Sequence, residues 1–295
     1  MIGVPTIDGK AFLESNRRLT DELLSRYSPS PDIQPKSLHE AMRYSLMAGG
    51  KRLRPILCLA TYEYCGGATG KLDSPVHYAM AALEMVHTYS LIHDDLPCMD
   101  DDDLRRGLPT VHKKFGEALA VLAGDALHVV AFELMAKTGK VEAVTELSAS
   151  VGTQGMLGGQ IADLEAENRP ATKADIRNIH TRKTGALIRG SVRIGAILAE
   201  ADQATLSKLT VYGEKIGLAF QIVDDILDVE GDAKILGKEV GSDSKNNKAT
   251  WPGVVGIDQA RKDSAELIDQ ALALFGPGEE NALMYLARYI GQREK

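Results

Sequence analysis

The sequence predicts an all-α fold, and three observations support this. No proline lies between Pro109 and Pro170 or between Pro170 and Pro252. These stretches are rich in Ala, Leu, Glu and Lys, which favour helices. Apolar residues recur along them at helical spacing, whereas the alternation typical of strands is rare. We therefore expect one helix after another.

Turn residues and caps divide the chain into helices. Three prolines between residues 29 and 35 mark a loop. Gly49-Gly50 ends the helix that follows this loop. Pro55 suits a first helical turn. No repeat or boundary splits the chain, so we expect a single domain over 1–295. The expected helices span 9–27, 37–48, 54–65, 75–95, 116–138, 141–168, a segment from 172 that breaks at 183–185, 202–228, 257–275 and 279–290.

Composition excludes several classes of protein. The chain has 295 residues, 44% of them hydrophobic and 25% charged, as is usual for a globular protein. Its net charge of −7 argues against a general nucleic-acid binder. Cys58, Cys65 and Cys98 form no C-x-x-C pair, which favours free thiols in a reducing compartment. We find no secretory signal and no uninterrupted apolar run long enough to span a membrane, and expect a cytoplasmic protein.

An acidic cluster follows the helix expected at 75–95. Six of the ten residues from Asp94 to Asp103 are aspartates. A run of this kind is either a solvated turn or a site for a divalent cation, since Mg²⁺ prefers carboxylate oxygens. Asp94 and Asp95 end a strongly apolar helix, where carboxylates without a function would be costly. This favours the cation site.

The helix expected at 202–228 ends in the same way. Gln221, Asp224, Asp225 and Asp228 stand at i, i+3, i+4 and i+7, and therefore share a face. Like charges four residues apart destabilise a helix unless a cation offsets them. Two helices that each end in an aspartate pair suggest one metal site between them.

Cationic and polar residues could complete such a site. Lys51, Arg52 and Arg54 lie at a helix start, where they oppose the helix dipole; they form either a surface patch or a cradle for an anion such as diphosphate. His87 lies two turns before Asp94, about 10 Å away, and is either structural or part of the site. Further candidates are the polar pair Gln160 and Asp163 and the helix break at Lys183-Thr184-Gly185.

The chemistry that these residues allow is narrow. We find no serine or cysteine nucleophile with a base, and no Walker loop, which disfavours acyl transfer and ATP hydrolysis. Metal ions held by two carboxylate clusters would neutralise a diphosphate and make it a better leaving group. The reaction class that remains is the ionisation of a diphosphate in a site surrounded by apolar helices.

The sequence resembles the trans-polyprenyl diphosphate synthases over essentially its whole length. Asp94-Asp95-x-x-x-x-Asp100 with Arg105-Arg106 resembles their first aspartate-rich motif, and Asp224-Asp225-x-x-Asp228 resembles the second. Other matches are Gly49-Gly50-Lys51-x-x-Arg54-Pro55, Gly159-Gln160, Lys183-Thr184 and Phe220-Gln221. The resemblance implies a single-domain all-α barrel of about ten helices around a central apolar cavity, usually as a homodimer.

The resemblance also implies a role for each site residue. About three Mg²⁺ ions, with Mn²⁺ as the alternative, would be ligated by Asp94, Asp100 and Asp224 and supported by Asp95, Asp225 and Asp228. The allylic diphosphate would be surrounded by Arg105, Lys183, Thr184, Gln221, Lys238 and Lys248. Isopentenyl diphosphate would be held by Lys51, Arg54, His87 and Arg106, with Arg293 and Lys295 closing over it. Catalysis is expected to depend on Asp94, Asp95, Asp100, Arg105, Lys183, Asp224 and Lys238.

Product length depends on residues one turn before Asp94. Ser90 is small and lies nearly below Asp94, whereas Tyr89 is bulky and lies on the flank. An aromatic residue there, with the four-residue spacer, resembles the bacterial C15 (farnesyl) synthases. A C20 (geranylgeranyl) product is the alternative. A terpene cyclase or a non-catalytic partner subunit is disfavoured, because the second motif and the isopentenyl cradle are intact.

Overall fold

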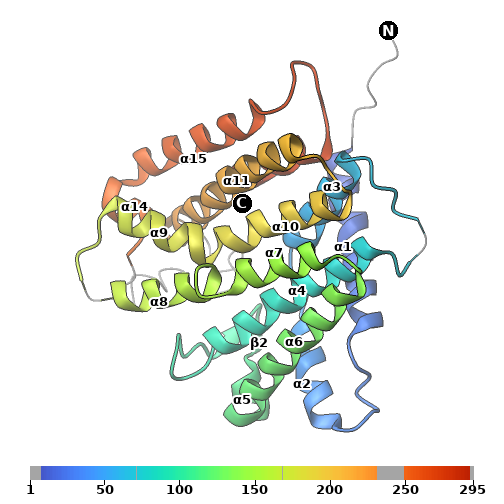
Figure 1. Cartoon of the computed structure of the whole chain (residues 1–295). Coiled ribbons are helices and arrows are strands. Elements are labelled where there is room, and N and C mark those ends of the chain that lie inside the picture. The colour runs from blue at the N-terminus through green and yellow to red at the C-terminus, as the bar shows by residue number, and fades with distance from the viewer. Residues whose placement is uncertain (1–7, 71, 168, 231–248, 293–295) are drawn as a thin grey trace.

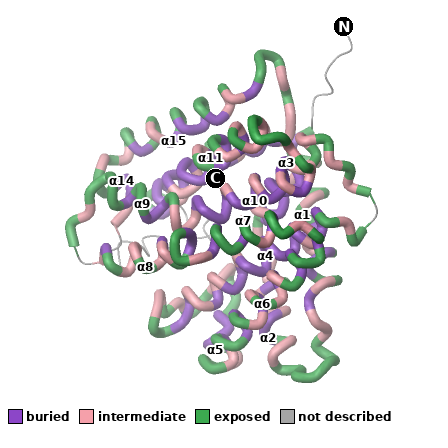
Figure 2. Tube along the Cα trace, in the orientation of Figure 1, coloured by how far each residue is buried: buried purple, intermediate pink, exposed green. Residues whose placement is uncertain are grey.

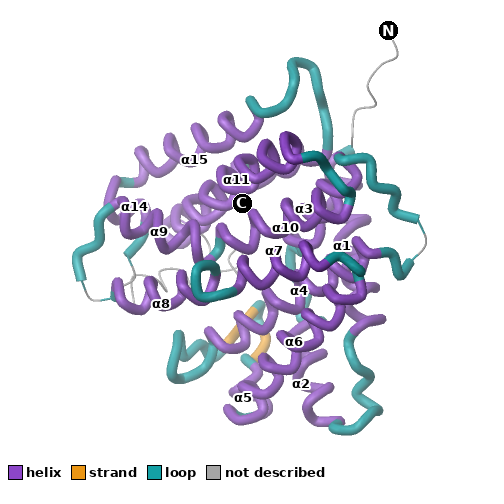
Figure 3. Tube along the Cα trace, in the orientation of Figure 1, coloured by secondary structure: helices purple, strands orange, loops and turns teal. Residues whose placement is uncertain are grey.

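The computed structural model describes residues 8–70, 72–167, 169–230 and 249–292. These residues form an all-α fold with one hairpin of two-residue strands (Figures 1 and 3). The helices of the N-terminal half are α1 Gly9–Tyr27, α2 Lys36–Leu46, α3 Leu53–Tyr64, α4 Pro75–Asp94, α5 Val111–Phe115, α6 Glu117–Lys137 and α7 Val141–Val151. Those of the C-terminal half are α8 Met156–Ala166, α9 Lys173–Lys183, α10 Gly185–Leu198, α11 Gln203–Glu230, α14 Trp251–Val255, α15 Ile257–Leu272 and α16 Ala282–Gly291. The predicted fold class is confirmed.

The two helices that carry the aspartate pairs lie in the middle of the molecule. Figure 1 shows the order from α15 through α11, α10 and α4 to α6, and each neighbouring pair in this order is in contact. Two glycines let α10 and α11 approach closely: a Cβ on Gly217 would lie 3.0 Å from Gly185 Cα. Helices α4 and α11 thus both pack against α10.

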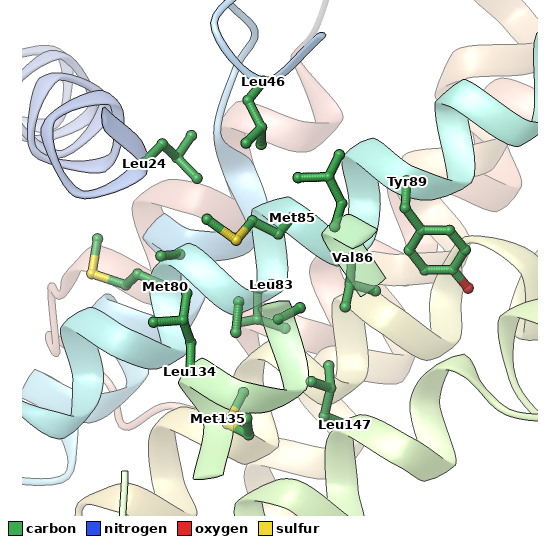
Figure 4. Close-up of a cluster of buried hydrophobic side chains, with 14 of the residues drawn as sticks. Leu24, Leu46, Met80, Leu83, Met85, Val86, Tyr89, Leu134, Met135 and Leu147 are labelled. Carbon is green, nitrogen blue, oxygen red and sulfur yellow. The ribbon is translucent and has the colours of Figure 1, made fainter. Parts of the chain in front are cut away.

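The apolar side chains form two clusters, one around each central helix. The first surrounds α4 and includes Leu24, Leu83, Leu134 and Leu147; Figure 4 shows Tyr89 at its edge. The second surrounds α11 and includes Tyr212, Ile216, Trp251 and Leu286. Figure 2 shows buried stretches along α4, α10 and α11 and alternating exposure on the outer helices. Burial of these stripes is the main stabilising contribution. The expectation of one domain over 1–295 stays a prediction.

The structure corrects some expected element boundaries. The helix expected over 141–168 ends at Val151 and restarts at Met156, because Gly152 and Gly155 lie where a Cβ would meet the carbonyls of Ser148 and Ser150. The short helices α5 and α14, five residues each, were not expected. Nor was the hairpin of β1 Leu104–Arg105 and β2 Leu108–Pro109, whose turn places Arg106 and Gly107 at positive φ.

Helix α6 is more apolar than its neighbours. By length and composition alone it would pass as a membrane span, although it contains no uninterrupted apolar run of that length. The core helix of a soluble protein passes the same test. One face of α6, with Ala123, Leu127 and Leu134, is buried against α4, and its other face is exposed.

Candidate active site

The ends of α4 and α11 line one cavity of about 530 Å³. Polar residues from both aspartate helices and from the helix break face it, and apolar residues line the remainder. The polar lining residues include Arg54, His87, Asp94, Asp100, Gln160, Asp163, His180, Lys183, Thr184, Gln221 and Asp225. The apolar lining residues include Tyr89, Leu91, Leu96, Met99, Val121, Met156, Leu157 and Ile179. The sequence prediction that the two motifs meet is supported by this shared cavity.

The first motif presents its aspartates in two different environments. Asp94 and Asp100 line the cavity and are half-buried, and the amide of Asp100 donates to the carbonyl of Asp94. Asp95 is 3% exposed and is bound by Arg105, whose Nε lies 2.8 Å from Asp95 Oδ1. Burial raises the pKa of Asp95 to about 6, although the Arg105 charge opposes this.

Arg105 and the remaining aspartates close the hairpin. Arg105 also donates to Asp102 at 3.0 Å, and Asp103 forms an ion pair with Lys113 at 2.6 Å. The hydroxyl of Thr110 donates to the Asp102 carbonyl at 2.9 Å. Arg105 was expected to contact the allylic diphosphate; here it is engaged by two carboxylates of its own loop.

The second motif is held by a hydrogen-bond network. Asp225 is 3% exposed and accepts three hydrogen bonds: from His180 Nε2 at 2.9 Å, from the Trp251 amide at 2.8 Å and from Gln221 Nε2 at 3.1 Å. Asp224 is half-buried and Asp228 is buried; both lie on α11 beside the cavity, outside its lining. Asp225 was expected to support the metals; here both of its oxygens already have protein donors.

Arginines surround His87, which lines the same cavity. The pKa of His87 is lowered well below its ordinary value, first by burial and then by the charges of Arg54, Arg106 and Arg105. Arg106 donates to the Gly49 carbonyl, and a Cβ on Gly50 (φ +143°) would lie 3.0 Å from the Arg106 guanidinium carbon. The Gly49-Gly50 turn thus brings Arg106 beside the start of α3. An anion in this pocket would relieve the repulsion among the arginines.

One of the three cations at the α3 start points into the core instead. Arg52 is buried, with a positive φ of 52°, and donates to Asp21 and Glu84, both at 2.8 Å, and to the Leu46 carbonyl at 2.7 Å. Lys51 is exposed and lies outside the cavity lining. Arg52 is therefore structural, and Arg54 is the cation of this group that reaches the cavity.

The break between α9 and α10 supplies a third wall. Lys183 and Thr184 line the cavity where α9 ends, and Lys183 Nζ donates to Asp163 at 2.6 Å. Gly159 permits this arrangement, because a Cβ there would lie 2.1 Å from the Lys183 amide nitrogen. The expected break and the polar lining by Gln160 and Asp163 are both present. Lys238, Lys248, Arg293 and Lys295 lie outside the described residues.

Aromatic side chains flank the cavity below Asp94. Tyr89 lines it and is 4% exposed, with its ring stacked on His128 of α6 at 4.6 Å and edge-on to His93 at 5.7 Å. Ser90 also lines the cavity, and its hydroxyl donates to the His87 carbonyl at 2.8 Å. Burial raises the pKa of Tyr89 to about 12.

The oxygen ligands fit magnesium bound together with a phosphate. No three carboxylate, imidazole or thiol groups among the described residues lie close enough together to hold a metal ion. Mg²⁺ usually keeps several waters and is bound by one or two carboxylates plus substrate phosphates, rather than by a cage of protein ligands. Asp94 and Asp100, which line the same cavity as Lys183, fit that mode.

Comparison with known proteins identifies the family. The sequence model described as polyprenyl synthetase matches residues 35–290. The chain belongs to the polyprenyl synthetase family. It is 46% identical to farnesyl diphosphate synthase of Escherichia coli (96% of this chain, 98% of the relative) and 45% identical to the chloroplastic geranylgeranyl pyrophosphate synthase of Catharanthus roseus (98% and 82%). A solved geranyltransferase from Helicobacter pylori, complexed with magnesium and isoprenyl diphosphate, has a TM-score of 0.82 and 32% identity, covering 97% of each chain.

These comparisons confirm the family predicted from the motifs. Membership makes the chain an enzyme, a trans-prenyl diphosphate synthase. Two site residues were missed in the sequence: His180, which binds Asp225, and His128, which stacks on Tyr89. His180 lies three residues before Lys183 and therefore on the same face of the helix. This spacing is the feature of the sequence that could have identified His180 as a site residue. Nothing local to His128 in the sequence indicates its contact with α4.

Proposed function

We propose that the enzyme condenses isopentenyl diphosphate with dimethylallyl and geranyl diphosphates to give (2E,6E)-farnesyl diphosphate and diphosphate. One observation carries the proposal: a single cavity is lined by Asp94 and Asp100 of the first motif, by Gln221 and Asp225 of the second, and by His87, which lies within the field of several arginines. The aspartates suit a metal-bound allylic diphosphate. The arginines suit a second diphosphate that needs no metal.

Each wall has a separate task in this reaction. Asp94 and Asp100 would hold Mg²⁺ together with Asp224, and the ions would neutralise the allylic diphosphate as it leaves. Lys183 would exchange its bond to Asp163 for a phosphate oxygen. Arg54, His87 and Arg106 would hold isopentenyl diphosphate with its double bond toward C1 of the allylic chain. His87 stays neutral at pH 7 and donates one N–H.

The chemistry is ionisation, condensation and elimination. The C1–O bond of the allylic diphosphate breaks, and the isopentenyl double bond attacks the resulting cation at C1. A proton is then lost to the departing diphosphate. Because Gln221 Nε2 is bound to Asp225, its amide carbonyl is the atom left to face positive charge in the cavity. Backbone carbonyls at the end of α9 would serve the same purpose.

Tyr89 supports a C15 product. Its ring lines the cavity, stacks on His128 and makes an edge-on contact with His93. A ring packed against two others cannot swing aside easily, so it would limit elongation of the chain. A C20 product is the second candidate, because relatives at similar identity include geranylgeranyl synthases.

The test is product analysis with defined substrates. The purified chain is incubated with isopentenyl diphosphate, Mg²⁺ and the C5, C10 or C15 allylic diphosphate, and the products are separated by chromatography. We expect C15 from the C5 and C10 substrates and little elongation of the C15 substrate. Efficient elongation of C15 would establish the C20 alternative. A cyclic hydrocarbon would indicate a terpene cyclase, and no elongation would indicate a non-catalytic subunit.

The exposed face of α6 supports a homodimer. Val121, Leu122 and Val129 lie on this face with exposed fractions of 40%, 55% and 68%. An apolar helix face of this kind is typical of an interface between copies of a chain. The three cysteines are free thiols, in keeping with a reducing cytoplasm. Sedimentation of wild type and of Val129→Glu tests the dimer, which the charge should weaken.

A further inference from the structure

Asp225 joins three separate elements of the fold. Its Oδ2 accepts from His180 on α9 and from the first amide of α14, at Trp251, and its Oδ1 accepts from Gln221 on its own helix. No Lys or Arg among the described residues forms an ion pair with it. A buried carboxylate is tolerated only when its oxygens are hydrogen-bonded. Asp225 therefore acts as a buried anchor.

His180 is the contact between this anchor and the helix break. It is buried and stands three residues before Lys183, on the same face of α9. Its ring lies parallel to that of Trp251, with 6.1 Å between centroids and 19° between planes. Trp251 Nε1 in turn donates to Asp263 of α15 at 2.8 Å, and Asp263 accepts from Lys173 at the start of α9 at 2.7 Å. His180 is thus fixed by packing and by hydrogen bonding.

We propose that His180 is a positioning residue which acts through Asp225. Its hydrogen bond sets the separation between Lys183 on α9 and the aspartate face of α11. It also saturates Asp225 Oδ2, so that Oδ1 receives Gln221 Nε2 and the Gln221 carbonyl is directed to the cavity. Asp225 then contributes to turnover as an anchor for its neighbours and not as a direct metal ligand. The turnover consequences rest on the proposed function.

Trp251 allows a test that does not depend on activity. It is the single tryptophan of the chain and lies against His180, so its fluorescence reports on the contact directly. We expect His180→Ala to shift Trp251 emission and to raise its quenching by acrylamide. His180→Gln, whose amide can donate to Asp225, should restore most of the wild-type signal. Thr181→Ala, on the exposed side of α9, is the matched control.

Kinetics test the effect on turnover. We expect His180→Ala to lower kcat by roughly 10- to 100-fold, the size of effect found when a residue that orients active-site groups without touching the substrate is removed. The KM for isopentenyl diphosphate should change less than about two-fold. Arg54 and His87, which would bind this substrate, lie on other helices, so the variant should leave its binding unchanged. His180→Gln should recover within a few-fold of wild type. Circular dichroism checks that both variants are folded.

A double-mutant cycle tests whether His180 acts through Asp225. If His180 acts through Asp225, then His180→Ala combined with Asp225→Asn should lose no more kcat than the worse single variant. Multiplying losses would overturn the proposal, as would wild-type fluorescence and kcat in a folded His180→Ala protein. If the wild-type chain shows no prenyl transfer, the proposed function is wrong. The fluorescence experiment would still test whether His180 holds its contact with Trp251.

Discussion

The two aspartate motifs look alike in sequence but are held in different ways. Asp95 and Asp225 are each the second aspartate of a pair at the end of an apolar helix, and each is 3% exposed. Asp95 is bound by a cation from its own loop, Arg105, ten residues later. Asp225 accepts hydrogen bonds from the His180 ring of α9, the Gln221 side-chain amide of α11 and the Trp251 backbone amide of α14. The first motif is organised locally and the second by the whole fold.

Because of this difference, Arg105 is near Asp95 in sequence, whereas two of the three partners of Asp225, His180 and Trp251, are distant. The hairpin at 104–109 returns Arg105 to the end of α4, where it also pairs with Asp102, and Asp103 pairs with Lys113 of the adjoining α5. In contrast, the second motif depends on the packing of His180 against Trp251. Changes to Asp225 and its partners should therefore disturb structure and turnover together, whereas changes in the first loop should separate them.

The largest expected effect is loss of turnover when the first aspartate of either pair is removed. Asp94→Ala and Asp224→Ala should each lower kcat by roughly a thousand-fold or more, because charge stabilisation in the transition state is lost. Steady-state kinetics with isopentenyl and geranyl diphosphates measures this, and the helical circular dichroism should be unchanged. Asp101→Asn, at an exposed position next to the motif, is the control. Near-wild-type turnover in either alanine variant would contradict the metal assignment.

Tyr89→Ala should lengthen the product from C15 toward C20. The side chain is the packed ring on the α4 wall of the cavity, so its removal opens space below Asp94. Product chromatography measures the change. His128→Ala should give a smaller shift in the same direction, because Tyr89 would lose its stacking partner. If the Tyr89→Ala protein still makes only C15, the ring is not what limits the length.

Asparagine at the second aspartates should affect stability unequally. Asp225→Asn replaces one of two accepting oxygens with an NH₂ donor, which then faces either Gln221 or the donors from α9 and α14, and should lower the free energy of unfolding by about 2 kcal/mol. Asp95→Asn leaves Arg105 its partner Asp102 at 3.0 Å, and should change it by less than about 1 kcal/mol. Urea unfolding at pH 7 measures both. Equal losses would mean that the two motifs are held alike.

The last expected effect is a pH dependence of stability from His87. Because its pKa is lowered in the folded state, the unfolded chain binds a proton near pH 6.5 while the native chain does not. The free energy of unfolding should therefore fall as the pH drops below about 6.5, by up to about 1.4 kcal/mol per pH unit. His87→Gln should remove this contribution. Parallel unfolding curves for the two proteins from pH 7.5 to 5 would show that His87 is not depressed.

Much of the site could be predicted because its pattern is local. The spacing of Asp94 and of Gln221 relative to their helix ends placed each on a polar face, and both line the cavity. Gly49-Gly50 predicted the end of a helix and Lys183-Thr184-Gly185 a helix break, and the structure contains both. The family resemblance then supplied roles that spacing alone left open.

The remaining features depend on tertiary contacts. Arg52 reads as a surface cation beside Arg54, but a left-handed backbone turns it toward Asp21 and Glu84, which lie 31 and 32 residues away. Arg105 reads as a phosphate ligand, yet a carboxylate ten residues earlier binds it in this state. His180 has no signal beyond its helical register with Lys183. Partners across the fold cannot be read from a single sequence.

The central claim is that α4 and α11 form one metal–diphosphate site that neither completes alone. The most direct test counts Mn²⁺ ions bound per chain by electron paramagnetic resonance, with and without inorganic diphosphate. We expect weak binding without diphosphate, about three ions with it, and loss of most of that gain in both Asp94→Ala and Asp224→Ala. Tight binding without diphosphate, or unchanged binding in either variant, would contradict the shared site.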